Sequence, residues 1–156
     1  MSAMIIREAN LADLETLLEF EQGIVSWERP FDDTLKEGEI HYYDLGAMIV
    51  ADDVYVAVAE CDGRVVGSGY ARIEQAKPYQ KFERYAYLGC MYVLPEFRGK
   101  GVNAMVLDAL EAWCRSRNIT EIRLEVYSNN HAAIKAYEKA GFKPTLMWMR
   151  MGLDDK

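Results

Sequence analysis

Residues 88–103 read LGCMYVLPEFRGKGVN, and this order predicts a strand, a tight turn and the start of a helix. The apolar, β-branched and aromatic residues up to Leu94 favour a buried strand. Pro95 ends that strand, because proline cannot donate a hydrogen bond to a ladder. Gly99 and Gly101 then let the backbone approach a ligand closely, since neither has a Cβ. A glycine-rich turn therefore follows a buried strand directly.

The residues after the turn predict an amphipathic helix within 99–116. The first turn of a helix has unpaired N–H groups at the positive end of the helix dipole, and these suit a phosphate or pyrophosphate. The alternative is an ordinary connection whose glycines serve only the turn, and this stretch by itself leaves both readings open. Apolar side chains recur on one helix face at Val102, Met105, Val106, Ala109, Leu110, Trp113 and Cys114.

A second stretch, residues 125–142, follows about one helix and one strand later, and the two stretches together resemble the GCN5-related N-acetyltransferases (GNAT). Arg98, Gly101 and Asn103 have the spacing of that family's pyrophosphate loop, with Asn103 in place of the usual Gly or Ala. The resemblance covers residues 86–144 closely and the N-terminal half in outline. The family's second signature is matched by Asn130, Ala133, Ile134, Tyr137, Glu138, Gly141 and Phe142.

The resemblance implies an α/β (α+β) fold, with one mixed, largely antiparallel, twisted sheet flanked by helices in a single domain over residues 1–156. It also implies acetyl-CoA as the acetyl donor and no metal. The coenzyme would lie between a strand at 87–93 and a strand at 120–127, which splay apart. The implied coenzyme contacts are Cys90, Met91, Tyr92, Val93, Arg98, Gly99, Lys100, Gly101, Val102, Asn103, Asn130 and Tyr137.

Within this set, the resemblance implies separate tasks for the strand and the loop. Backbone groups of Cys90, Met91 and Val93 would pair with the pantetheine arm as an added strand does. The N–H of Met91 would stabilise the oxyanion of the tetrahedral intermediate. The amides of residues 98–103 would bind the pyrophosphate, with the charge of Lys100 nearby.

Acyl transfer from a thioester to an amine needs a neutral amine, a stabilised oxyanion and a protonated leaving thiolate. By resemblance, Tyr137 is the general acid. Glu125, in a Leu-Glu-Val segment that resembles the ribosomal-protein alanine N-acetyltransferases, would assist the amine. The alternatives are that Tyr137 is a core tyrosine and that Glu125 merely pairs with Arg123 or another cation. Tyr87 is a candidate for positioning water, and the alternative is simple packing.

The predicted function is transfer of the acetyl group of acetyl-CoA to a primary amine, by direct attack within a ternary complex. The acceptor is either a small-molecule amine or a protein or peptide amine, and the N-terminal half shows no pattern that decides between them. The alternative is a non-catalytic acyl-CoA-binding or regulatory module of the same fold. Asn103 is the one feature that leans towards this alternative.

Composition sets further limits on the function. A chain of 156 residues with 51% hydrophobic residues fits one domain with a full core. Cys61, Cys90 and Cys114 are odd in number and lack a C-x-x-C spacing, which predicts reduced core thiols in a cytoplasmic protein. No apolar run reaches the length of a membrane span. A net charge of −7 disfavours nucleic-acid binding and suits a cationic amine acceptor.

The N-terminal half predicts two helices and a hairpin. Residues 4–7 favour a first strand, and Asn10 caps a helix that runs to about Trp27. Asp32-Asp-Thr caps a second helix, with Leu35 and Ile40 on its inner side. The first helix pair would wall the acceptor pocket, by resemblance. Most of the acidic residues here are predicted to lie on solvated helix faces, namely Glu19, Glu21, Glu28, Asp32 and Asp33.

Turn chemistry predicts the remaining elements. Asp62-Gly63 joins strands at 54–60 and 64–73 in a hairpin. Asn129 or Asn130 caps the last helix, and Gly141 ends it, with Phe142 folding back as a hydrophobic partner. Residues 146–153 predict a last strand, and pairing through that strand would allow a homodimer.

Overall fold

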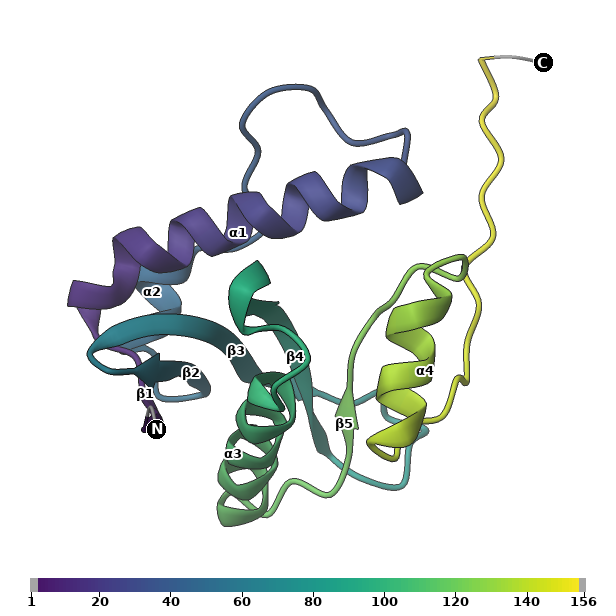
Figure 1. Cartoon of the computed structure of the whole chain (residues 1–156). Coiled ribbons are helices and arrows are strands. Elements are labelled where there is room, and N and C mark those ends of the chain that lie inside the picture. Colours follow the sequence, from purple (N-terminus) through teal and green to yellow (C-terminus); the bar gives the residue numbers. More distant parts are fainter. Residues whose placement is uncertain (1–2, 155–156) are drawn as a thin grey trace. The chain divides into compact units, whose positions relative to one another are not determined.

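The computed structural model describes residues 3–154 and contains one sheet with the strand order β1-β2-β3-β4-β5 (Figure 1). The pairs β1–β2, β2–β3 and β3–β4 are antiparallel, and β4–β5 is parallel. The predicted mixed, largely antiparallel sheet is therefore confirmed. The strands are β1 (Met4–Glu8), β2 (Val54–Cys61), β3 (Arg64–Gln75), β4 (Arg84–Val93) and β5 (Ile122–Arg123).

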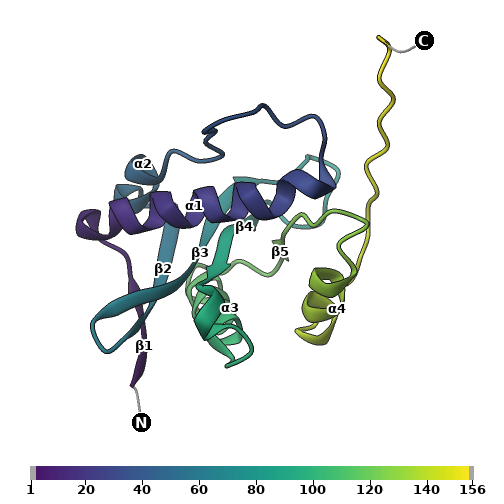
Figure 2. The same ribbon diagram turned by 45° about the horizontal axis from the view of Figure 1, so that its top comes forward.

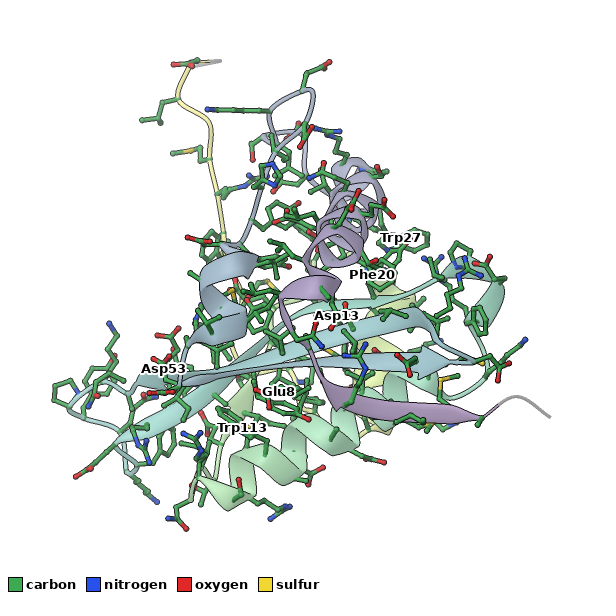
Figure 3. All side chains as sticks on the ribbon, turned by 90° about the vertical axis from the view of Figure 1, so that its left-hand side faces the viewer. Glu8, Asp13, Phe20, Trp27, Asp53 and Trp113 are labelled. Atoms are coloured by element: carbon green, nitrogen blue, oxygen red, sulfur yellow. The ribbon has the colours of Figure 1, made fainter. Side chains whose placement is uncertain are left out.

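Helices cover both faces of this sheet. Helices α1 (Leu14–Glu28) and α2 (Leu45–Val50) lie on one face, and α3 (Val102–Ser116) lies on the other, as the positions of Phe20 and Trp113 show (Figure 3). Helix α1 crosses β2, β3 and β4 (Figure 2). Both helix-covered faces belong to one compact unit, which extends to Leu124.

The residues from Glu125 onward form a second, smaller unit, which contains α4 (His131–Lys139). After α4 ends, the described chain to residue 154 has no helix or strand. The prediction of a last strand at 146–153 is therefore wrong. The apolar side chains of this segment stay exposed instead of pairing in a sheet, including Leu146, Met147, Trp148 and Met149.

Successive side chains of β2 pack against the helices on opposite faces of the sheet. Val54, Val56 and Val58 belong to the cluster that α1 and α2 cover. Tyr55 points to the opposite face, where its ring stacks on Trp113 of α3 at a centroid distance of 5.7 Å. Successive side chains of a strand point to opposite faces, so one buried strand contributes to both layers.

Most of the predicted elements are confirmed. The hairpin turns at Asp62 (φ 52°) and Gly63 (φ 83°), as the Asp-Gly pair predicts. The side chain of Asn10 accepts a hydrogen bond from the N–H of Ala12 at 2.9 Å at the entry to the first helical turn. The three cysteines are free and buried, which confirms the expected core thiols.

Two further boundaries differ from the predictions. The second helix does not begin at 32–34, and α2 starts only after Asp44, whose side chain accepts from the N–H of Ala47 at 3.3 Å. The side chain of Asp32 accepts from the N–H of Thr34 at 3.0 Å in a local turn that does not lead directly into a helix. The strand expected at 120–127 is paired only at Ile122 and Arg123.

A single methyl group at Gly89 is expected to destabilise the fold. A Cβ there would lie 2.5 Å from Cζ of Tyr70, which is buried and cannot shift into solvent. We expect Gly89→Ala to lower the free energy of unfolding by about 1–3 kcal/mol through overpacking. Urea denaturation measures this change.

Gly46→Ala is the matched control for this prediction. A Cβ on Gly46 would meet only Cδ2 of Leu14 at 3.7 Å, an ordinary contact distance. Because alanine is the better helix former, this variant is expected to gain up to about 1 kcal/mol. Equal and small effects at the two positions would contradict the packing at Gly89.

Candidate active site

The loop between β4 and α3 presents backbone N–H groups at the start of a helix. Gly99 (φ 76°) and Gly101 (φ 82°) both adopt left-handed backbone conformations, and Gly101 is the N-cap of α3. The first helical hydrogen bond runs from the N–H of Met105 to the carbonyl of Gly101 at 3.1 Å. The N–H groups of residues 102–104 therefore precede the helical hydrogen-bond series and face the helix start.

This loop lines a solvent-open cavity of about 150 Å³. A Cβ placed on Gly99 or Gly101 would meet no atom within 4 Å, so the space beside both glycines is open. The predicted phosphate-binding residues are thus brought together, with Lys100 adjacent in the chain. The cavity is lined by Val93, Phe97, Arg98, Gly99, Gly101, Val102, Asn103 and Ala104.

Arg98 is held in place by contacts from both β4 and α1. Its Nε donates to the carbonyl of Val93 at 2.9 Å. Its guanidinium lies 5.5 Å from the ring centroid of Tyr92 and 5.8 Å from that of Trp27 at the end of α1, a cation–π arrangement with both rings. These contacts therefore hold a positive charge beside the cavity, which Arg98 lines. Figure 3 shows Trp27 on the same helix as Phe20.

Strand β4 has a β-bulge at two of the residues predicted to pair with the pantetheine arm. Ser68 pairs with Tyr92 and Tyr70 pairs with Gly89, so Cys90 and Met91 together lie opposite one residue, Gly69. Cys90 has a φ of 52°, which is unusual for a residue with a side chain. Such bulges redirect backbone groups away from the ladder.

The bulge directs the N–H of Met91 away from β3. The hydroxyl of the buried Ser68 donates to the carbonyl of Cys90 at 2.7 Å. The carbonyl of Cys90 and the N–H of Met91 belong to one trans peptide group, in which the two bonds point in opposite directions. The Met91 N–H therefore points away from Ser68, whereas the N–H of Cys90 donates to the hydroxyl of Tyr43 at 3.2 Å.

The edge of β4 beyond the bulge is open within the described first unit. Pairing with β5 is limited to Ala86 with Ile122 and Tyr87 with Arg123, while β4 continues to Val93. An open strand edge offers N–H and C=O groups to an extended ligand. Among the described residues up to Leu124, β4 and β5 have no paired residues beyond Tyr87 and Arg123. The expectation that the coenzyme lies between two splayed strands stays a prediction.

The Cys90 thiol beside this edge is buried. Burial raises its pKa from 9.0 to about 12, with the charge of Glu21 adding to the effect. Because the native pKa lies above the unfolded value, this group's contribution to stability is complete below pH 9.0 and is lost as the pH rises towards 12.

We therefore expect the native protein to react only slowly with Ellman's reagent at about pH 8, because the reagent needs an accessible thiolate. Cys61 and Cys114 are buried as well. The urea-unfolded protein is the control and is expected to react at all three thiols at once. Rapid labelling of the native protein would contradict the burial of at least one of these three thiols.

In the second unit, Asn130 and Gly141 mark the two ends of α4, as predicted. The side chain of Asn130 accepts from the N–H of Ala133 at 3.3 Å. Gly141 (φ 110°) donates to the carbonyl of Glu138, and Phe142 donates to the carbonyl of Tyr137, each at 3.0 Å. These two bonds form a Schellman motif at the end of the helix.

Tyr137 takes part in this helix end through its ring. The ring centroids of Tyr137 and Phe142 are 5.6 Å apart in an edge-to-face arrangement, which confirms that Phe142 folds back on the helix. The packing at the helix end therefore depends on the ring, and the hydrogen bonds of the motif are made by backbone groups. The expected role of Tyr137 as an acid stays a prediction.

Glu125 lies outside any strand and is exposed. Arg123, one of the cations considered as its partner, pairs with Glu121 through a 2.6 Å contact. The Arg123 guanidinium also lies 3.9 Å from the ring centroid of Tyr85. The catalytic role of Glu125 stays a prediction, as does the water-positioning role of Tyr87.

Sequence patterns did not indicate two residues that contact the site. Trp27 and Tyr43 reach it from α1 and from the segment before α2. The only signals in the sequence are a large aromatic side chain at a helix end and a Tyr-Tyr pair after a proline-broken helix. Neither signal specifies which residue the side chain contacts. Only the packing of α1 against β4 identifies them.

Two observations on the described residues, 3–154, concern metal binding and membrane-spanning helices. These residues contain no cluster of three or more His, Cys, Asp and Glu side chains placed to hold a metal ion. They also contain no helix with the length and apolar character needed to cross a bilayer.

Comparisons with known proteins agree with this geometry. A sequence model of the Acetyltransferase (GNAT) family matches residues 14–142. An N-alpha-acetyltransferase of Sulfurisphaera tokodaii is 30% identical over 146 residues, which cover 88% of this chain and 79% of that protein.

Two solved structures share the fold. One is a predicted acetyltransferase from Clostridium acetobutylicum with acetyl-CoA, 21% identical over 99% of each chain, with a TM-score of 0.73. The other is the glucosamine-6-phosphate N-acetyltransferase of Arabidopsis thaliana, 20% identical over 97% of this chain and 99% of that one, with a TM-score of 0.69. With a family match over most of its length, the chain belongs to the GNAT acetyltransferase family.

Proposed function

We propose that this protein transfers the acetyl group of acetyl-CoA to a primary amine, by direct attack of the amine within a ternary complex. One observation carries the proposal. The open, bulged edge of β4 ends at Val93, and Val93 also lines the cavity of the glycine-rich loop. An extended thioester arm and its phosphates would therefore find their two binding elements next to each other.

The loop suits a pyrophosphate in charge and in space. The backbone amides of residues 98–103 and the charges of Arg98 and Lys100 would bind it, with Val102 and Asn103 in the first turn of α3. Asn103, which replaces a smaller residue of the family pattern, lines the cavity and leaves it open. Backbone groups of residues 90–93 would pair with the pantetheine arm.

The reacting groups are proposed as follows. Met91 donates its N–H to the oxygen that becomes the oxyanion. Tyr137 protonates the departing thiolate, Asn130 contacts the coenzyme, and Glu125 assists deprotonation of the amine. The roles of these last three residues, all in the second unit, rest on the family resemblance.

The acceptor proposed is the α-amino group of a peptide or protein. Two features favour it over a small-molecule amine. The relative that is 30% identical is named an N-alpha-acetyltransferase, and the Leu124-Glu125-Val126 segment resembles the ribosomal-protein alanine N-acetyltransferases. The ordinary pKa of an α-amine, about 7.7–8.0, leaves much of it neutral near physiological pH, which eases the demand on the base.

The first test is calorimetric titration with acetyl-CoA, with desulfo-coenzyme A and free adenine nucleotides as controls. We expect saturable binding of acetyl-CoA and a raised melting temperature, because a ligand that binds only the native state stabilises it. An absence of binding at about millimolar coenzyme, a free energy weaker than about −4 kcal/mol, would overturn the proposal.

The second test identifies the acceptor by thiol release. Peptides with a free α-amine are compared with the same peptides acetylated at the N-terminus but carrying a free lysine, and with small polyamines. Turnover confined to free α-amines is the expected result. Binding of acetyl-CoA without turnover on any amine would favour the non-catalytic acyl-CoA-binding module instead.

Two wider features complete the proposal. We propose a cytoplasmic location, because the chain has free, buried thiols. We also propose that the chain folds as one domain over 1–156. The homodimer expected from pairing through a strand at 146–153 loses that basis, because no strand forms there. It stays a prediction, which light scattering coupled to gel filtration would test. A purely monomeric mass at working concentration would contradict the dimer.

A further inference from the structure

Glu21 is a completely buried carboxylate in α1 whose hydrogen-bond partners come from one segment. Its Oε2 accepts hydrogen bonds from the N–H of Tyr42 at 2.7 Å and from the N–H of Tyr43 at 2.9 Å. Its Oε1 lies 2.7 Å from Nδ1 of His41. The expectation that the acidic residues here are mostly solvated therefore fails at Glu21. A buried carboxylate is tolerated only where such bonds offset its desolvation.

Gln22 of α1 and Arg29, the residue after the helix, make further hydrogen bonds to the same segment. Nε2 of Gln22 donates to the carbonyl of Ile40 at 2.7 Å. Arg29, just after the helix, donates to the carbonyls of Lys36 and Gly38. The segment that leads from α1 to α2 is therefore hydrogen-bonded at several points to α1 and to Arg29. Among these residues, Glu21 is the one that accepts from the N–H of Tyr43.

Tyr43 extends this order to the bulge of β4. Its hydroxyl accepts from the N–H of Cys90 at 3.2 Å, and its ring lies edge-to-face on Tyr70 at 5.4 Å. Cys90 is held in its left-handed conformation on one side by Tyr43 and on the other by Ser68. A non-glycine residue keeps such a conformation only where its surroundings enforce it.

We propose that Glu21 is a positioning residue for acyl transfer. By fixing Tyr43 against the N–H of Cys90, it holds the bulge in the geometry that directs the Met91 N–H towards the open edge of β4. This inference rests on the proposed function, in which Met91 donates to the oxyanion. Misplacing a catalytic donor by about an ångström is enough to cost a large part of the rate.

A competing role for Glu21 would run through His41. The side chain of His41 is half exposed, and its hydrogen bond to Glu21 raises its pKa. In that role the charge of Glu21 would matter and the two amide bonds would not. Glutamine separates the two roles, because its carbonyl oxygen still accepts from both amides while the charge is lost.

The experiment compares Glu21→Gln, Glu21→Leu, His41→Asn and Tyr43→Phe in turnover and in acetyl-CoA affinity, with the best peptide acceptor as substrate. We expect Glu21→Leu and Tyr43→Phe each to lower kcat by about ten-fold or more, with the Kd for acetyl-CoA within about two-fold of the parent value. Glu21→Gln and His41→Asn are expected to retain most of kcat. Equal losses in Glu21→Gln, Glu21→Leu and His41→Asn would overturn the proposal in favour of the His41 role.

Amide NMR of the ligand-free protein provides a readout that needs no turnover. Tyr43→Phe keeps the ring and removes only the acceptor of the Cys90 N–H, so the amide signals of Cys90 and Met91 are expected to shift and to exchange faster with solvent. Unchanged signals would overturn the inference even in an active enzyme. Shifted signals in a protein that binds no acetyl-CoA would instead show that the proposed function has failed while the structural link stands.

Discussion

Replacing Tyr137 with Phe is expected to lower kcat by about 100-fold, the lower range for loss of a general acid, while acetyl-CoA affinity stays unchanged. The phenol would protonate the departing thiolate, and phenylalanine cannot. The ring itself closes the end of α4 against Phe142, a contact that phenylalanine preserves. The variant therefore removes the proton donor without removing the packing.

The measurement is steady-state thiol release together with calorimetric binding of acetyl-CoA. Tyr79→Phe is the matched control, because Tyr79 is exposed in the loop between β3 and β4 and has no proposed role. We expect that control to match the parent protein. A Tyr137→Phe enzyme with full kcat would leave Tyr137 as a packing residue and assign the proton to another group.

Replacing Gly101 with Val is expected to weaken acetyl-CoA binding by about ten- to a hundred-fold, or about 1.4–2.7 kcal/mol. Gly101 has a φ of 82°, a conformation that a β-branched residue strongly disfavours. A changed backbone at the N-cap would turn the first amides of α3 away from the cavity. The new side chain would also enter the open space where the pyrophosphate is proposed to lie.

Gly63→Val is the control that isolates backbone strain from binding. Gly63 has a φ of 83° in the β2–β3 turn, and a Cβ added there would likewise meet no atom within 4 Å. Both variants are expected to lose about 1–3 kcal/mol of stability by this strain. Only Gly101→Val should lose affinity in calorimetry. If Gly101→Val and Gly63→Val bound acetyl-CoA with equal affinity, the proposal that the loop binds the coenzyme would be wrong.

Local patterns in the sequence are sufficient to predict the parts of the site that lie close together in the chain. Pro95, Gly99 and Gly101 act on their own backbone, so the end of β4 and the start of α3 follow from residue type. The same holds for the ends of α4, where Asn130 caps the first turn and Gly141 closes the last. Such hydrogen bonds join residues a few positions apart, and they form wherever the local sequence permits.

The failed boundaries show where local patterns are ambiguous. The Asp32-Asp-Thr pattern fits a helix cap and an isolated turn equally well, and in the fold it makes the turn. Residues 146–153 have the apolar pattern of a strand, yet a strand also needs a partner edge, which periodicity does not supply.

Tertiary structure alone decides the long-range contacts that shape the open edge of β4. In the sequence, Glu21 is one of several acidic residues along a helix, and its residue type predicts a solvated side chain. Its complete burial and the hydrogen bonds from the amides of residues 42 and 43 make it a structural carboxylate. Tyr43 then meets Cys90, 47 positions further along the chain. The physical reason is that a hydrogen bond in a low-dielectric interior depends on which groups the fold excludes from water together, and no local spacing encodes that pairing.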